Sequence, residues 1–127
     1  MEVLNGEFHV QIDGQNILLK IGMWILDENR FEEFQKKIPN SGLWQDCAIF
    51  YGAYCNACRS RKKDATLNPQ TFLEWYENAL SYDAENLAEL TKILVDEVNK
   101  LVDNQKKIRA LANQFLGQTS ANTPLAS

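Results

Sequence analysis

The segment LWQDCAIFYGAYCNACR, residues 43–59, carries two adjacent rows of mostly apolar side chains at spacings of three and four residues. One row consists of Leu43, Cys47, Phe50, Tyr54 and Cys58, and the other of Trp44, Ala48, Tyr51 and Cys55. Such spacing is typical of a helix, and a surface helix needs only one apolar stripe. A helix with two adjacent rows has to be covered from more than one side. We therefore predict a central core helix over residues 42–60, with Ser41 as its N-cap.

The composition is that of a soluble globular protein. The chain has 127 residues and a formal net charge of -4, with 24% charged and 45% hydrophobic residues. This length suits one domain, and we expect residues 1–116 to form it without disulfide or metal staples. Nucleic acid is not expected as the main partner, because neutralising phosphates requires a basic face. The N-terminus has neither a charged leader nor a long apolar run, so we expect a cytoplasmic protein away from membranes.

Residues 8–21 form two short apolar alternations on either side of Asp13-Gly14, a dipeptide that favours a tight hairpin turn. With this turn as the loop, the expected cross-strand pairs are Ile12 with Gln15, Val10 with Ile17 and Phe8 with Leu19. One face then holds Phe8, Val10, Ile12, Ile17, Leu19 and Ile21, and the other holds His9, Gln11, Asn16 and Lys20. Leu18 alone breaks this alternation. A two-stranded hairpin is marginal in water, so its apolar face should lie on helices.

Two shorter helices are expected on either side of the central one. Residues 23–38 are amphipathic, and the helix begins either at Met23 or after Asp27 as N-cap. Residues 69–80 form the other, because Asn68 can cap it and a proline is favoured at the first helical position. Together these segments predict a mostly α fold with a small N-terminal β-hairpin, an α+β arrangement that ends in a long C-terminal helix.

That last helix is predicted over residues 84–116, followed by a disordered tail, residues 117–127, with Gly117 as the cap. About 33 residues give a rod of roughly 50 Å, longer than a domain of this size is wide, so part of it should project. The candidate partner-binding residues on its apolar seam are Leu94, Val98, Leu101, Ile108, Leu111 and Phe115. Glu97 and Asn104 interrupt the seam, so a long regular coiled coil is not expected. Contact with a partner or a second copy, and packing back on the chain's own domain, both remain open.

The chain shows little that would carry chemistry. Cys55 and Cys58 form a CxxC pair with Cys47 two turns earlier, but zinc needs a fourth ligand and His9, the single histidine, lies on the polar hairpin face. The pair also falls near the end of its helix, whereas a redox pair belongs at the start. We interpret the cysteines as core residues. No metal, cofactor or catalytic motif is predicted, so we expect a protein that is not an enzyme.

A basic run, Arg59 to Lys63, follows the central helix. Cations favour the C-terminal end of a helix, which explains the run without a partner. Contact with an acidic partner is the alternative.

Four segments in order support a family resemblance. They are IDGQNILLKIGMWIL (12–26), LWQDCAIFYGAYCNA (43–57), TLNPQTFLEWYENA (66–79) and ENLAELTKILVDEV (85–98). In order and spacing they resemble the tail assembly chaperones of long-tailed bacteriophages and the related gene transfer agent proteins, over about residues 7–98. Two features depart from that pattern: the length of the helix past Asn99, and the three cysteines.

The resemblance implies a non-catalytic protein of the host cytoplasm that is absent from the mature virion. Its expected partners are the tape measure protein, which it keeps soluble while tail tube subunits polymerise, and the tail tube protein itself. In many phages a programmed frameshift adds a C-terminal extension that recruits the tube protein. The departures leave two alternatives, a structural head-tail connector or tail completion protein, and a small cytosolic cysteine or metal-binding protein that uses Cys47, Cys55 and Cys58.

Overall fold

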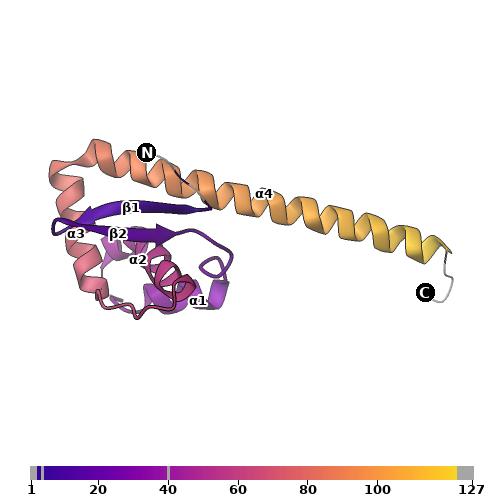
Figure 1. Cartoon of the computed structure of the whole chain (residues 1–127), viewed down its shortest axis with the longest axis horizontal. Coiled ribbons are helices and arrows are strands. Elements are labelled where there is room, and N and C mark those ends of the chain that lie inside the picture. Colours follow the sequence, from indigo (N-terminus) through magenta and orange to yellow (C-terminus); the bar gives the residue numbers. More distant parts are fainter. Residues whose placement is uncertain (1–2, 4, 40, 123–127) are drawn as a thin grey trace.

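The computed structural model describes residues 3, 5–39 and 41–122, with side chains up to residue 117. Its elements in chain order are β1 (Glu7–Ile12), β2 (Gln15–Lys20), α1 (Glu28–Gln35), α2 (Gly42–Ser60), α3 (Pro69–Tyr82) and α4 (Ala84–Asn122). The hairpin and the first half of α4 lie together with α1, α2 and α3 in one body, and the rest of α4 projects from it (Figure 1). The predicted fold class, mostly helical with an N-terminal hairpin and a long C-terminal helix, is confirmed.

The hairpin has the predicted register. Phe8 pairs with Leu19, Val10 with Ile17 and Ile12 with Gln15 in an antiparallel two-stranded sheet. Asp13 and Gly14 have φ angles of 52° and 76°, which is the conformation that a two-residue hairpin turn requires. The apolar face is buried as expected, except that Ile17 is only half-buried. Leu18 lies opposite His9 on the other face and is also half-buried.

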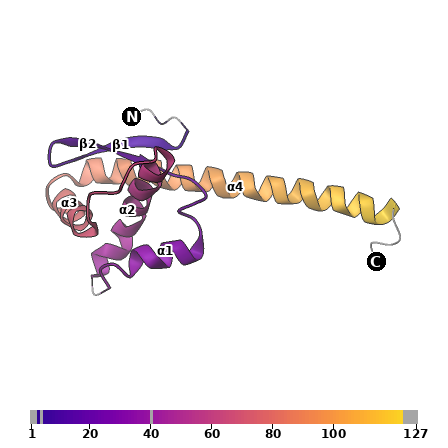
Figure 2. The ribbon, with the colours of Figure 1, turned by 60° about the horizontal axis from the view of Figure 1, so that its bottom comes forward.

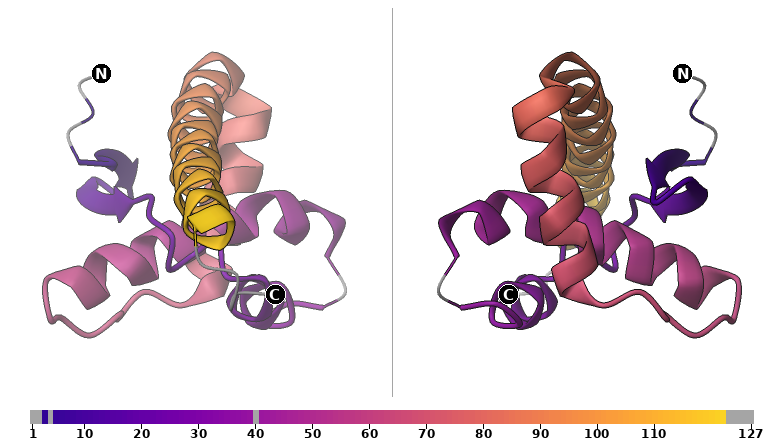
Figure 3. Two further views of the ribbon diagram at one scale, coloured as in Figure 1. Left: turned by 90° about the vertical axis from the view of Figure 1, so that its right-hand side faces the viewer. Right: turned by 90° about the vertical axis from the view of Figure 1, so that its left-hand side faces the viewer.

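α2 is the central core helix. Ser41 caps it by accepting a hydrogen bond from the Trp44 amide at 3.3 Å. β2, α1 and α3 all pack on α2, which therefore lies in the middle of the body (Figures 2 and 3). The buried members of its two rows are Trp44, Cys47, Ala48, Phe50, Tyr51 and Tyr54. The predicted rows are not buried throughout, because Leu43 at the open start of the helix is 36% exposed.

α1 is shorter than the predicted helix over residues 23–38. Asp27 is its N-cap, with a carboxylate oxygen that accepts a hydrogen bond from the Arg30 amide at 3.2 Å. The preceding residues form a turn instead, which places the Ile25 side chain, 1% exposed, in the core. At the other end the Lys36 amide bonds to carbonyls of the last turn, so the helix closes before Ile38.

α3 and α4 both run past their predicted ends. Asn68 caps α3 through the Thr71 amide at 2.9 Å, and the helix continues to Tyr82. α4 has 39 residues and does not end at Gly117, because this glycine does not adopt the left-handed conformation of a helix cap. A glycine inside an exposed helix costs only about 1 kcal/mol, which is too little to stop it. Of the predicted disordered tail, residues 117–122 are helical and residues 123–127 lie outside the described part of the chain.

Every helix in the described part of the chain is too short or too polar to span a bilayer.

Candidate functional site

The α4 helix passes through two environments. Near its start, Leu87, Leu90 and Leu94 are 3%, 2% and 5% exposed and belong to the hydrophobic core. Val98 and Leu101, one and two turns further on, are half-buried against the same core. From residue 106 to residue 117 every side chain is exposed. Figure 1 shows why, since the body ends beside the middle of α4 and the helix continues alone.

The exposed half keeps an apolar side. We define the distal stripe as Ile108, Leu111, Phe115 and Leu116, which are 65%, 62%, 69% and 59% exposed. Ile108 follows Leu101 by seven residues, or about two helical turns. The distal stripe therefore continues the same side of α4 that meets the core further back. It is an apolar surface held on a rigid helix outside the body.

The six candidate partner-binding residues are not one surface. Ile108, Leu111 and Phe115 lie in the distal stripe, where they remain candidates for partner contact. Leu94 belongs to the core, and Val98 and Leu101 pack against it, so these three serve the chain's own domain. Packing on the chain's own domain therefore applies to the first half of α4, and contact with a partner stays a prediction for the second half. Leu116 was not among the predicted candidates, although it lies eight residues after Ile108 and so falls on the same side of the helix.

Cations flank the distal stripe. Lys107 and Arg109 adjoin Ile108 on either side in sequence, so they project about 100° to each side of it around the helix. Residues 106–127 contain three basic residues, Lys106, Lys107 and Arg109, and no acidic residue, a balance of +3. Because the whole chain carries -4, residues 1–105 carry -7. The projecting half of α4 is therefore basic, and the body is acidic.

Two residues of the basic run at the end of α2, Arg59 and Arg61, make contacts within the body. The Arg59 guanidinium lies 4.9 Å from the Trp24 ring centroid and donates a hydrogen bond to the Asn56 side-chain oxygen at 3.1 Å. Arg61 forms an ion pair with Glu7 at 2.8 Å, which joins the end of α2 to the hairpin. These contacts support the interpretation of the run as a helix end.

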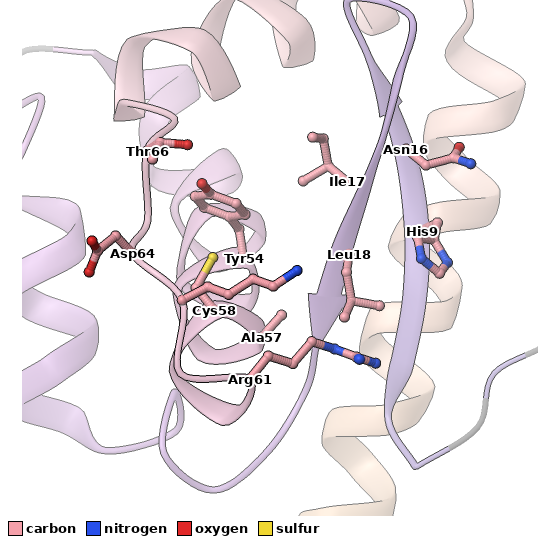
Figure 4. Close-up of a pocket in the computed structure, with 11 residues that line it drawn as sticks. His9, Asn16, Ile17, Leu18, Tyr54, Ala57, Cys58, Arg61, Asp64 and Thr66 are labelled. Atoms are coloured by element: carbon pink, nitrogen blue, oxygen red, sulfur yellow. The ribbon is translucent and has the colours of Figure 1, made fainter.

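An open cavity of about 430 Å³ lies between β2, the end of α2 and the loop that follows it. Figure 4 shows Tyr54, Cys58 and Arg61 on one side of it and His9 and Leu18 on the other. The Tyr54 hydroxyl is already engaged, since it accepts a hydrogen bond from the Leu67 amide at 3.0 Å. The Asp64 carboxylate points away from the cavity in Figure 4. The Asp64 carboxylate is therefore not placed to fix a small molecule in this cavity.

The three cysteines are placed for packing. Cys47 is fully buried, and this burial raises the pKa of its thiol to about 12. Burial also raises the pKa of Cys55. A raised pKa keeps a thiol protonated and unreactive near neutral pH. No group of three or more His, Cys, Asp or Glu side chains that could hold a metal ion occurs among the described residues.

The arrangement of α4 is thus suited to binding another protein. An exposed apolar stripe on a preformed helix can pack against the apolar side of a second helix or into a groove. Comparison with protein-family models, with curated proteins and with solved structures finds no match for this chain.

Proposed function

We propose that this protein is a non-catalytic tail assembly chaperone of a long-tailed bacteriophage, which binds the tape measure protein and keeps it soluble during tail tube assembly. The observation that carries this proposal is the distal stripe, with Ile108 and Leu111 more than 60% exposed on a helix that projects from the body. The resemblance of residues 7–98 supplies the identity of the partner. The expected site of action is the host cytoplasm, and the protein is expected to be absent from the mature virion.

The physical role of the distal stripe is to cover apolar surface on a long helical partner. Full burial of Ile108, Leu111 and Leu116 contributes roughly 1.5–3 kcal/mol for each side chain, or about 5–9 kcal/mol together. Association costs about 4–15 kcal/mol in lost freedom of motion. Contact through one stripe is therefore weak and reversible. This suits a chaperone that has to release its client when tube subunits arrive.

Co-expression with the tape measure protein of the same phage tests the proposal. The wild-type chain should increase the soluble fraction of the tape measure protein. An I108S/L111S variant should lose most of this effect, because it removes two apolar side chains from the distal stripe. The matched control is A110S/N113S, which introduces two serines on the opposite side of the same exposed helix. A tape measure protein that is equally soluble with and without the wild-type chain would refute the proposal.

The structural alternative, a connector or tail completion protein, makes the opposite prediction about the particle. Mass spectrometry of purified virions should not detect the chaperone, whereas a completion protein stays in the particle. A slippery heptamer before the stop codon, followed by an overlapping reading frame, would support the chaperone and its interaction with the tail tube protein.

A further inference from the structure

A second apolar surface lies on the body. It is bordered by α1, by the turn that precedes α1 and by α2. We define the α1 groove by its lining residues, Ile25, Leu26, Glu28, Phe31, Glu32, Gln35 and Ile49, which enclose about 430 Å³. Leu26, Phe31 and Ile49 are half-buried and form the apolar lining. Glu28 and Glu32 are exposed on one row of α1, four residues apart, so they place two carboxylates at the same groove.

The distal stripe is complementary to the α1 groove in charge. The groove is apolar with two carboxylates, Glu28 and Glu32. The stripe is apolar with two cations, Lys107 and Arg109, on its flanks. Opposite charges beside an apolar contact fix the register of two docking surfaces and exclude wrong partners.

The two surfaces are also similar in length. α1 runs from Glu28 to Gln35, seven steps along a helix, and the stripe runs from Ile108 to Leu116, eight steps. At 1.5 Å for each residue, they are about 10 Å and about 12 Å long. Two turns of α4 therefore fit alongside α1.

The stripe of a given molecule cannot reach that molecule's own groove. α4 is one continuous helix, and its exposed half points away from the body (Figure 1). α1 lies across α2 from α4 in both Figures 1 and 2. The groove and the stripe that complement each other must therefore meet between two molecules.

We propose that the distal stripe of one copy docks in the α1 groove of a second copy. The occupant is a second copy because the body carries -7 and the projecting helix +3, so each molecule presents both halves of one charge-complementary contact. The contact uses two different surfaces. It can therefore close, as a reciprocal dimer or a larger ring, or continue as an open chain.

This inference goes beyond the chaperone proposal and does not depend on it. Head-to-tail association covers the apolar stripe while no client is present. A client helix that binds the stripe would then compete with the groove of the neighbouring copy.

Charge exchange between the two surfaces tests the inference by sedimentation velocity. The sedimentation coefficient of the wild-type chain should rise with protein concentration and fall back when salt is added. The E28K/E32K and K107E/R109E variants should each associate about tenfold more weakly, because each turns the attraction into repulsion. An equimolar mixture of the two should regain the wild-type behaviour, since every groove then finds a stripe of opposite charge.

The matched control is E85K/E89K, which reverses two exposed glutamates with the same spacing in the first turns of α4. Its association should be closer to that of the wild type than the association of E28K/E32K or of K107E/R109E. Circular dichroism should show that all four proteins keep their helix content. A wild-type chain that stays monomeric at high concentration would overturn the inference. So would unchanged association of E28K/E32K, which would point to pairing of the α4 helices alone. Failure of the mixture to regain association would equally overturn it.

Discussion

Trp44 joins α1 to α2 through one buried hydrogen bond, and its replacement by Phe isolates the value of that contact. Its side chain is fully buried, at 0% exposure. The indole Nε1–H donates to the Phe34 carbonyl at 2.9 Å, where the last turn of α1 ends. The ring centroid also lies 5.9 Å from that of Tyr51. Trp44→Phe keeps an aromatic ring and removes the donor.

The expected change in the free energy of unfolding follows from the atoms and the hydrogen bond that Phe lacks. Phe lacks three of the heavy atoms of Trp, and at roughly 0.8 kcal/mol for each buried methylene-sized group their loss costs about 2 kcal/mol. The lost hydrogen bond to the Phe34 carbonyl adds about 1 kcal/mol. We therefore expect Trp44→Phe to lower the free energy of unfolding by about 3 kcal/mol.

Trp75→Phe is the matched control. Trp75 is half-buried beside Phe50, with ring centroids 5.4 Å apart, and its indole N–H has no hydrogen-bond partner among the described residues. The same three atoms are lost from a partly exposed site, so the expected cost is about 1 kcal/mol. Urea denaturation followed by circular dichroism measures both, and an unchanged slope with denaturant shows that the transitions are comparable. If Trp44→Phe destabilises the protein no more than Trp75→Phe does, the assignment of Trp44 as the bond between α1 and α2 is refuted.

Three further predictions concern the core and the length of α4. Gly52→Ala should lower the melting temperature, because a Cβ at this position would lie 3.0 Å from the Phe34 ring. Gly117→Ala should instead raise the helix content measured by circular dichroism, because a Cβ there would meet nothing within 4 Å. Burial of the Cys47 thiol raises its pKa to about 12 from 9.0, so the folded state favours the protonated thiol. The contribution of this thiol to the free energy of unfolding is therefore complete below pH 9 and is lost as the pH rises towards 12. Alkaline denaturation of Cys47→Ala should show a smaller loss over that range. A chain truncated after Gln105 should unfold at the wild-type urea concentration, because residues 106–117 are exposed. A large loss of stability would contradict the division of α4.

Much of the fold could be predicted because its signals are local. The alternation around Asp13-Gly14 determines the hairpin register, since a slip of one residue would turn the apolar side chains to solvent. Ser41 and Asn68 were recognisable as N-caps, because their side-chain oxygens accept from the following helix amides. The start of α1 was not determined in this way, because the sequence left it open between Met23 and Asp27. It depends on where Ile25 finds the core, which is a tertiary contact.

Part of the candidate site on α4 was also predictable, because its apolar side is again a local signal. Heptad spacing shows which side of α4 is apolar, and it identified Ile108, Leu111 and Phe115 correctly as members of one stripe. Spacing does not show how far the body extends along the helix, so Leu94 was assigned to a partner surface although it lies in the core. The α1 groove brings Ile49 of α2 next to Glu28 and Glu32 of α1, which only the folded chain does.

The two halves of α4 depend on each other physically. An isolated helix of the length of the exposed half is marginal in water, because forming its first turn fixes several residues for one hydrogen bond. Here that first turn already exists, since Leu87, Leu90 and Leu94 are buried and hold the start of α4 in the core. Each further residue then adds a hydrogen bond to an existing helix, and even Gly117 is accommodated. The stripe is consequently ordered before any partner arrives, and binding does not have to repay the entropy of folding it. The burial that places Leu94 in the core is therefore what holds Ile108 and Leu111 in position on an exposed helix.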